Sequence, residues 1–213
     1  MGREFDQLFD QWAPTYDHTV SGHDEEYRDV FMNYDEILSN VANKAKGTVI
    51  EFGVGTGNLT KKLLDRGLNV IGVEPSEKMR EITKNKMNFE AIEGDFLHFP
   101  IPDEKVDSIV STYAFHHLTD EEKEKAISYY SSILSKNGDI IIADTIFSTE
   151  EEKLKTENDY KQKGYDRLVH DLQTEYYTTI PILTSIFEKH GFNVRFERMN
   201  HFVWIAHAKI SNH

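Results

Sequence analysis

Residues 49–60 constrain the fold most strongly, because they combine an apolar run, three glycines and the start of a helix. The run Val-Ile-Glu-Phe is predicted to form a strand buried on both faces. The alternate glycines that follow allow a tight turn without any Cβ, so that a ligand can lie against the main chain. They are Gly53, Gly55 and Gly57. A helix predicted from Asn58 to Arg66 directs its N-terminal amides toward that ligand. The stretch predicts a βα unit with a binding site at its turn, and a purely structural turn is the alternative.

Two acids are expected beside this turn. Glu51 lies in an apolar strand, where an unpaired carboxylate is costly, so it is expected at the strand's C-terminal end, facing the turn and a donor or cation. The next predicted strand, 69–74, also ends in an acid, Glu74, which follows Gly53 by 21 residues. In a βαβ unit an acid at this place can accept both hydroxyls of a ribose. The two strands therefore favour a ligand that contains a nucleoside.

The glycine pattern separates this turn from other phosphate-binding and nucleotide-binding loops. The dinucleotide pattern G-x-G-x-x-G fails, because Asn58 and Thr60 stand where its last glycine is required, and there is no G-x-x-x-x-G-K-[ST] loop. The pattern E-x-G-x-G-x-G with a later acid-ended strand resembles the S-adenosylmethionine (SAM) site of class I methyltransferases. The resemblance implies SAM as cofactor and S-adenosylhomocysteine as product. It also implies cofactor contacts from Glu51, Gly53, Gly55, Gly57, Glu74 and Pro75.

Three later positions complete the site that this resemblance implies. Asp95 follows the third predicted strand, where it can accept the amine of adenine while Phe96 packs on the ring. Ser111 ends the fourth predicted strand, which is expected to lie beside the first and to form the floor of the methyl-transfer pocket. Asp144 ends the fifth predicted strand, and either lines the acceptor pocket or caps the following turn.

The order of elements resembles the seven-stranded, Rossmann-like class I methyltransferases. The strands are predicted at 49–52, 69–74, 88–93, 105–112, 139–145, 192–198 and 201–209. More narrowly, residues 1–5, 113–122 and 202–205 resemble the YrrT family of bacterial methyltransferases. The fold implied is an α/β three-layer sandwich with a mostly parallel seven-stranded sheet, an antiparallel C-terminal hairpin and an N-terminal helical lid. A single domain is expected over 1–213, made of a lid (1–46), a SAM-binding half (47–147) and an acceptor-side part (148–213).

The lid is predicted from residues that precede the first strand. An amphipathic helix is expected over Phe5, Leu8, Phe9 and Trp12, followed by a turn at 15–18 and a second helix over 24–43. Packing of these helices on the core is the alternative to a lid that closes over the ligand. Tyr16 is placed by the resemblance near the reacting groups.

Candidate general bases are His116 and Tyr16. His116 and His117 are adjacent and would point in different directions on a regular element, and no other histidine or carboxylate lies at metal-ligand spacing. No metal site is therefore predicted. Specificity candidates are four aromatic or basic residues of the acceptor-side part: Tyr165, His170, Tyr176 and Tyr177.

Composition narrows the function. The formal net charge of −13 with no Lys/Arg stripe disfavours nucleic acid and favours a small-molecule acceptor. There is no cysteine, no apolar run long enough for a membrane span and no signal peptide pattern, so a cytoplasmic location is expected. The sequence does not indicate an oligomeric state. The alternatives to a SAM-dependent methyltransferase are a non-catalytic module that binds SAM, its product or a partner and, less favoured, an NAD(P)-dependent oxidoreductase.

Overall fold

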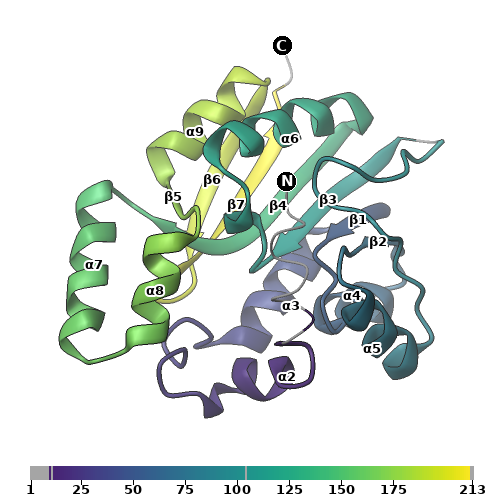
Figure 1. Ribbon diagram of the computed structural model, residues 1–213. Helices are drawn as coiled ribbons and strands as arrows, with labels where there is room; N and C mark the ends of the chain where they lie inside the picture. Colours follow the sequence, from purple (N-terminus) through teal and green to yellow (C-terminus); the bar gives the residue numbers. More distant parts are fainter. Residues whose placement is uncertain (1–9, 11, 104, 212–213) are drawn as a thin grey trace.

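The computed structural model describes residues 10, 12–103 and 105–211 (Figure 1). Within them, one mostly parallel sheet runs in the order β2-β1-β3-β4-β7-β6, and a seventh short strand, β5, pairs with β4. β1, β2, β3 and β4 are parallel neighbours, whereas β7 is antiparallel to both β4 and β6. The predicted fold class is confirmed. The strands are β1 (Thr48–Phe52), β2 (Asn69–Val73), β3 (Val106–Thr112), β4 (Leu134–Phe147), β5 (Thr178–Thr179), β6 (Phe192–Arg198) and β7 (Val203–Ile210).

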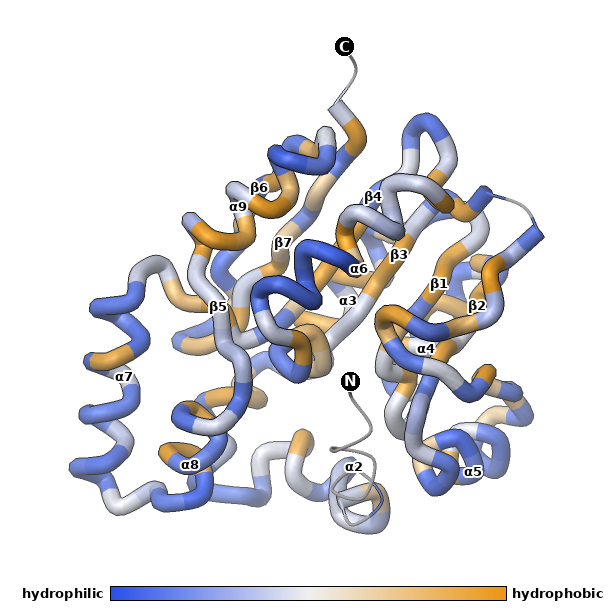
Figure 2. The backbone as a smooth tube through the Cα atoms, turned by 45° about the horizontal axis from the view of Figure 1, so that its top comes forward, coloured by the Kyte–Doolittle hydropathy of each residue, from blue (hydrophilic) through white to orange (hydrophobic). Residues whose placement is uncertain are grey.

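Helices cover both faces of the sheet. On one face α6 and α9 pack against residues such as Ile50 and Ile140, and on the other α3, α4 and α8 pack against the alternate residues Val49 and Ile141. Figure 2 shows hydrophobic residues along the central strands and a largely hydrophilic α7. The helices are α2 (Tyr16–His18), η1 (Thr19–His23), α3 (Tyr34–Lys44), α4 (Asn58–Asp65), α5 (Glu77–Met87), η2 (Phe115–His117), α6 (Asp120–Ile133), α7 (Glu150–Gln162), α8 (Asp166–Thr174) and α9 (Ile180–Lys189).

The predicted strand over 88–93 is wrong, because only an isolated bridge forms there. Asn88 adopts a left-handed conformation with φ 54° that ends α5, so the chain cannot enter a strand at that point. Ile92 alone pairs with β2, accepting from the Glu74 amide at 3.0 Å and donating to the Gly72 carbonyl at 2.7 Å. The seventh strand of the sheet is instead β5, the two-residue strand that directly precedes α9.

The segment before β1 also differs from prediction. The second helix starts at Tyr34 and not at residue 24, because Asn33 is left-handed with φ 63°. Residues 15–18, predicted as a turn, contain the short helix α2, which continues into the π-helical turn η1. Most of the predicted first helix lies outside the described residues. In the described part of the chain, no helix combines the length and apolar character that crossing a membrane requires.

Candidate active site

A cavity of about 750 Å³ opens at the C-terminal ends of β1, β2 and β3. β2 and β3 lie on opposite sides of β1, so this is the point where the strand order reverses and where α/β sheets bind ligands. Most of the predicted cofactor residues line it: Gly53, Gly55, Glu74, Pro75, Asp95 and Phe96. Tyr16 of α2 lines it as well, whereas Glu51, Gly57 and Ser111 do not.

Glu74 holds the glycine turn in place. Its buried carboxylate accepts the Gly55 amide at 2.8 Å through one oxygen and the Ser76 amide at 2.9 Å through the other. Gly53 and Gly55 have φ of 72° and 56°, a conformation that side chains disfavour. A Cβ built on Gly55 would meet no protein atom within 4 Å, although Gly55 lines the cavity. The turn therefore leaves open space against its main chain, as a bound nucleoside requires.

The opposite wall of the cavity carries an acid and an aromatic pair. Asp95 accepts the amides of Leu97 and His98 at 2.8 and 2.9 Å, which fixes the loop before β3. The Phe96 ring stacks on Phe52, with their centroids 5.3 Å apart. This wall combines a hydrogen-bond acceptor with an apolar surface, the pair of features that an adenine ring needs.

Two predicted residues serve the framework around the turn. Gly57 is the N-cap of α4, and a Cβ there would lie 2.6 Å from the Met87 methyl carbon. Ser111 lies buried in β3, and its hydroxyl has no hydrogen-bond partner among the described residues. Neither residue lines the cavity.

Glu51 is buried under the turn at the end of β1. Its carboxyl accepts the Thr60 hydroxyl at 2.7 Å, so the donor expected from the sequence comes from α4. Burial raises the pKa of Glu51 to about 8, and the nearby Glu74 carboxylate adds to this, while the Thr60 hydrogen bond opposes it. Glu51 is therefore mostly protonated in the folded protein at neutral pH.

Replacing Glu51 with glutamine is expected to remove a pH-dependent loss of stability. Because the pKa is raised from 4.5 in the unfolded chain to about 8, the folded state binds the proton more tightly, and stability falls as pH rises through that window. At pH 8 and above the variant should gain about 2–4 kcal/mol over the parent, with little difference below pH 4.5. The free energy of unfolding in urea, measured for both proteins from pH 4 to 8.5, tests this. The same dependence of that free energy on pH in both proteins would contradict the prediction.

A second cavity, of about 620 Å³, adjoins the first. The two share Tyr16, Tyr113 and His117 in their linings. The remaining wall of the second cavity is aromatic and acidic, and includes Tyr27, Phe31, Asp171, Glu175 and Tyr177. Two adjoining compartments with common wall residues can hold two reactants side by side.

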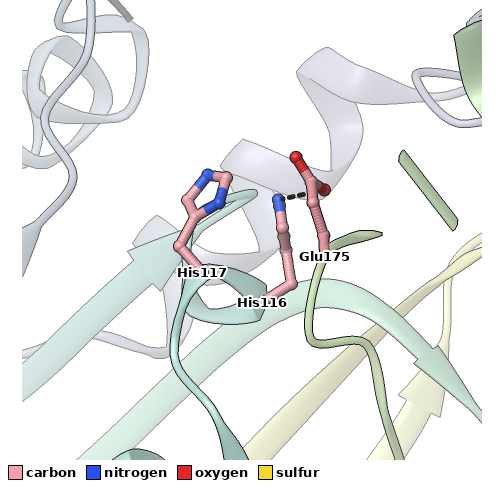
Figure 3. A group of neighbouring side chains, drawn as sticks. All are labelled: His116, His117 and Glu175. Atoms are coloured by element: carbon pink, nitrogen blue, oxygen red, sulfur yellow. Dashed lines mark ion pairs between the residues drawn. The ribbon is translucent and has the colours of Figure 1, made fainter. Parts of the chain in front are cut away.

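His116 lies at the edge of the second cavity and is held by two carboxylates. Its Nδ1 is 2.7 Å from Asp144, and its ring stacks on Tyr177. Its Nε2 is 3.2 Å from Glu175 (Figure 3). Burial alone would lower the pKa of His116, but the charges of Asp144 and Glu175 outweigh it and raise the pKa. A protonated imidazole has no lone pair, so in this arrangement His116 is poorly suited to act as a general base. Asp144, left open by the sequence, positions His116 and does not line the second cavity.

His117 and Tyr16 line both cavities and carry no charge at neutral pH. Burial, together with the nearby His116 and Lys123, lowers the pKa of His117 well below its ordinary value. Burial and the neighbouring Tyr34 raise the pKa of Tyr16 well above its ordinary value, so its phenol stays protonated and can donate a hydrogen bond. Tyr16 therefore lies in the wall that the two cavities share, with a hydroxyl that can donate.

Glu175 is the site residue that the sequence did not indicate. It lies 59 residues after His116 in a segment between α8 and β5, and the Tyr176 amide donates to the His116 carbonyl at 3.0 Å. Tyr177, a predicted specificity candidate, lines the cavity, whereas Tyr165, His170 and Tyr176 do not. In the sequence, only the two adjacent tyrosines Tyr176 and Tyr177 marked this segment as a candidate, and they gave no indication that Glu175 belongs to the site.

Comparisons with known proteins agree with this geometry. A family model described as a methyltransferase domain matches residues 49–138. An uncharacterised methyltransferase of Bacillus cytotoxicus is 58% identical over 98% of this chain and 99% of its own length, and one of Bacillus mycoides is 56% identical over the same shares.

Solved structures show the same fold. Magnesium protoporphyrin IX methyltransferase of Synechocystis PCC 6803, solved with bound SAM, is 17% identical with a TM-score of 0.64 over 88% of this chain and 85% of that one. The YcgJ protein of Bacillus subtilis is 14% identical with a TM-score of 0.63 over 84% and 99%. Given relatives above half identity across nearly its whole length, the chain belongs to the methyltransferase family.

Proposed function

We propose that this protein transfers the methyl group of SAM to a small-molecule acceptor, with the cofactor in the first cavity and the acceptor in the second. The observation that carries the proposal is that the two cavities adjoin at Tyr16, Tyr113 and His117. A methyltransferase has to hold donor and acceptor next to each other and away from water.

The residues of the first cavity fit the cofactor. SAM needs room against the main chain, and the open space at Gly55 provides it. Its ribose can bind to the Glu74 carboxylate, and its adenine fits the wall formed by Asp95 and Phe96. The Synechocystis enzyme, which shares the fold, has been solved both with SAM and with S-adenosylhomocysteine. When bound, SAM supplies an electrophilic methyl group on a sulfonium.

The chain's own contribution is alignment and exclusion of water. Holding two reactants in an attack geometry can lower a barrier by roughly 7–11 kcal/mol in well-aligned cases. Tyr16 and Tyr113 close the shared wall with half-buried aromatic rings, and the Tyr16 hydroxyl can orient either reactant. A base is needed only where the acceptor carries a proton into the attack.

The second cavity supports a neutral or cationic small molecule as acceptor. Its aromatic rings can pack on an apolar or cationic group, and Asp171 and Glu175 supply carboxylates. An acidic wall and a chain charge of −13 both repel a phosphate backbone.

The proposal is tested with SAM carrying a labelled methyl group, incubated with the protein and pooled metabolites of low mass. Label is expected to move to one or a few small molecules, and Glu74→Ala, which removes the carboxylate from the glycine turn, should suppress the transfer. Calorimetry should detect SAM binding but not NAD binding. Tight, salt-sensitive binding to DNA or RNA, or NAD binding in place of SAM, would overturn the proposal.

The N-terminal segment is proposed to act as a lid, and Asp17 ties it to the glycine turn. Asp17 accepts the Thr56 hydroxyl at 2.6 Å and the Asn58 amide at 3.0 Å, and Lys86 approaches it at 3.1 Å. These contacts fix the helix that carries Tyr16 above the cofactor cavity.

Asp17→Ala is therefore expected to weaken SAM binding by about tenfold, the scale of one or two lost hydrogen bonds to a charged group. Calorimetry measures it, with Asp65→Ala, which removes an exposed acid from α4, as the control. In a Trp204→Phe background, Trp12 is the single tryptophan and should report lid closure as a SAM-dependent emission shift. Unchanged SAM affinity together with an unresponsive Trp12 would leave the segment a structural role only.

A further inference from the structure

We propose that His116, His117 and Glu175 form a binding site for a divalent transition-metal ion of the zinc class, at the wall of the second cavity. Each residue offers one ligand atom, and these atoms lie within 4.8 Å of one another (Figure 3). All three residues line the second cavity. The sequence argument against a metal depended on a missing third ligand and on diverging rings, and the structure removes both premises.

The separation of the ligand atoms suits a small ion. Two ligands about 2.1 Å from a tetrahedral zinc are roughly 3.4 Å apart. Nε2 of His116 and Oε2 of Glu175 are 3.2 Å apart, which is already close to that spacing. The short helix η2 brings the His117 ring alongside, with its centroid 4.1 Å from that of His116. The ligand atoms lie within 4.8 Å of one another, so His117 would have to move closer to complete a three-ligand face.

Two of the proposed ligands, His116 and Glu175, are each held by a further residue, as the ligands of metal sites commonly are. Asp144 lies 2.7 Å from Nδ1 of His116, which fixes the tautomer with Nε2 directed at Glu175. The Tyr177 hydroxyl donates to Glu175 at 2.5 Å. The Tyr176 amide donates to the His116 carbonyl at 3.0 Å, so the segment that carries Glu175 is tied to the histidine turn.

The charges around the three residues favour a cation. Asp144, Asp171 and Glu175 contribute carboxylates near the site, and the ammonium groups of Lys123 and Lys153 oppose them. A metal ion would replace the His116 proton, so that binding should weaken as pH falls.

The ligand set selects the metal class and the use of the site. Two imidazoles and one carboxylate suit zinc, cobalt or iron(II) and not magnesium or calcium, which prefer oxygen. Because all three residues line the second cavity, an ion held there could take a group of the acceptor as a further ligand. If the proposed function holds, an acceptor hydroxyl or thiol bound there would lose its proton to solvent and attack the methyl group as the anion. No protein base would then be needed.

The test uses full-length protein freed of any purification tag and stripped of metal by chelator. Calorimetry with Zn²⁺ and absorption titration with Co²⁺ are expected to show one ion per chain, with the visible bands of a four-coordinate cobalt. Glu175→Gln and His117→Asn should each weaken binding by at least 100-fold. Glu188→Gln and His23→Asn, at an exposed glutamate and at one of the stacked surface pair His18/His23, should leave it unchanged.

SAM titrations of the same samples separate the possible failures. Variants that retain the parent's SAM affinity are folded, so their loss of metal is a property of the ligands. Absence of stoichiometric binding, or binding that survives Glu175→Gln and disappears with His23→Asn, would overturn the metal site while leaving the methyltransferase proposal intact. Metal binding without any SAM binding would overturn the proposed function instead.

Discussion

Gly55→Val should abolish SAM binding, weakening it by at least about 100-fold, or roughly 2.7 kcal/mol. Gly55 lines the first cavity, and a side chain built there enters open space and not a protein wall. The turn cannot move aside easily, because the Gly55 amide is held by the Glu74 carboxylate at 2.8 Å. The branched side chain would therefore occupy space that the cofactor needs. Calorimetric titration with SAM measures the loss.

Gly164→Val is the matched control for backbone strain. Gly164 lies between α7 and α8, has φ of 76° against 56° for Gly55, and likewise has no atom within 4 Å of a built Cβ. Both variants carry a β-branched residue at positive φ, so both should lose some thermal stability. Only the Gly55 variant should lose SAM. Normal SAM affinity in that variant would show that the cofactor does not approach this turn.

The sequence predicted those parts of the fold that depend on local patterns. The glycine turn depends on residues within a few positions of one another, and it is present. The C-terminal hairpin follows from alternation and is also present.

The errors arose where distant contacts decide the conformation. Residues 24–33 have aromatic residues at helical spacing, yet Arg167 pairs with both Asp24 and Glu26 and fixes a loop there. The hydroxyl of Tyr27 is bound to Asp171 on α8. Neither contact leaves a signal within the segment itself.

The candidate site shows the same division. Glu74, Asp95 and the glycines lie in one βαβ region, so their spacing was informative. The contact of His116 with Glu175 joins two segments that only the sheet and α8 bring together. The sequence consequently contained both histidines but gave no reason to expect a third ligand.

Lys123 shows how the fold supports that contact. It is only 1% exposed in α6, and its ammonium donates to the carbonyls of Leu118 and Tyr176. It thus ties α6 and the histidine turn to the segment that carries Glu175. Its ion-pair partner Asp120 is 3.4 Å away and partly exposed. Burial lowers the pKa of Lys123, so holding this charge has a cost.

Lys123→Met keeps the length and the apolar stem but removes the buried ammonium that donates to the Leu118 and Tyr176 carbonyls. A buried carbonyl left without a donor costs about 1–3 kcal/mol, and breaking a buried charged contact typically costs about 3–5 kcal/mol. We therefore expect urea denaturation to give a free energy of unfolding about 3–5 kcal/mol lower than that of the parent. Lys125→Met, on the exposed side of α6, should change this free energy little. If methionine leaves stability unchanged or increases it, the desolvation cost of the ammonium exceeds the worth of its two hydrogen bonds, and Lys123 is retained for the position of Glu175 and not for stability.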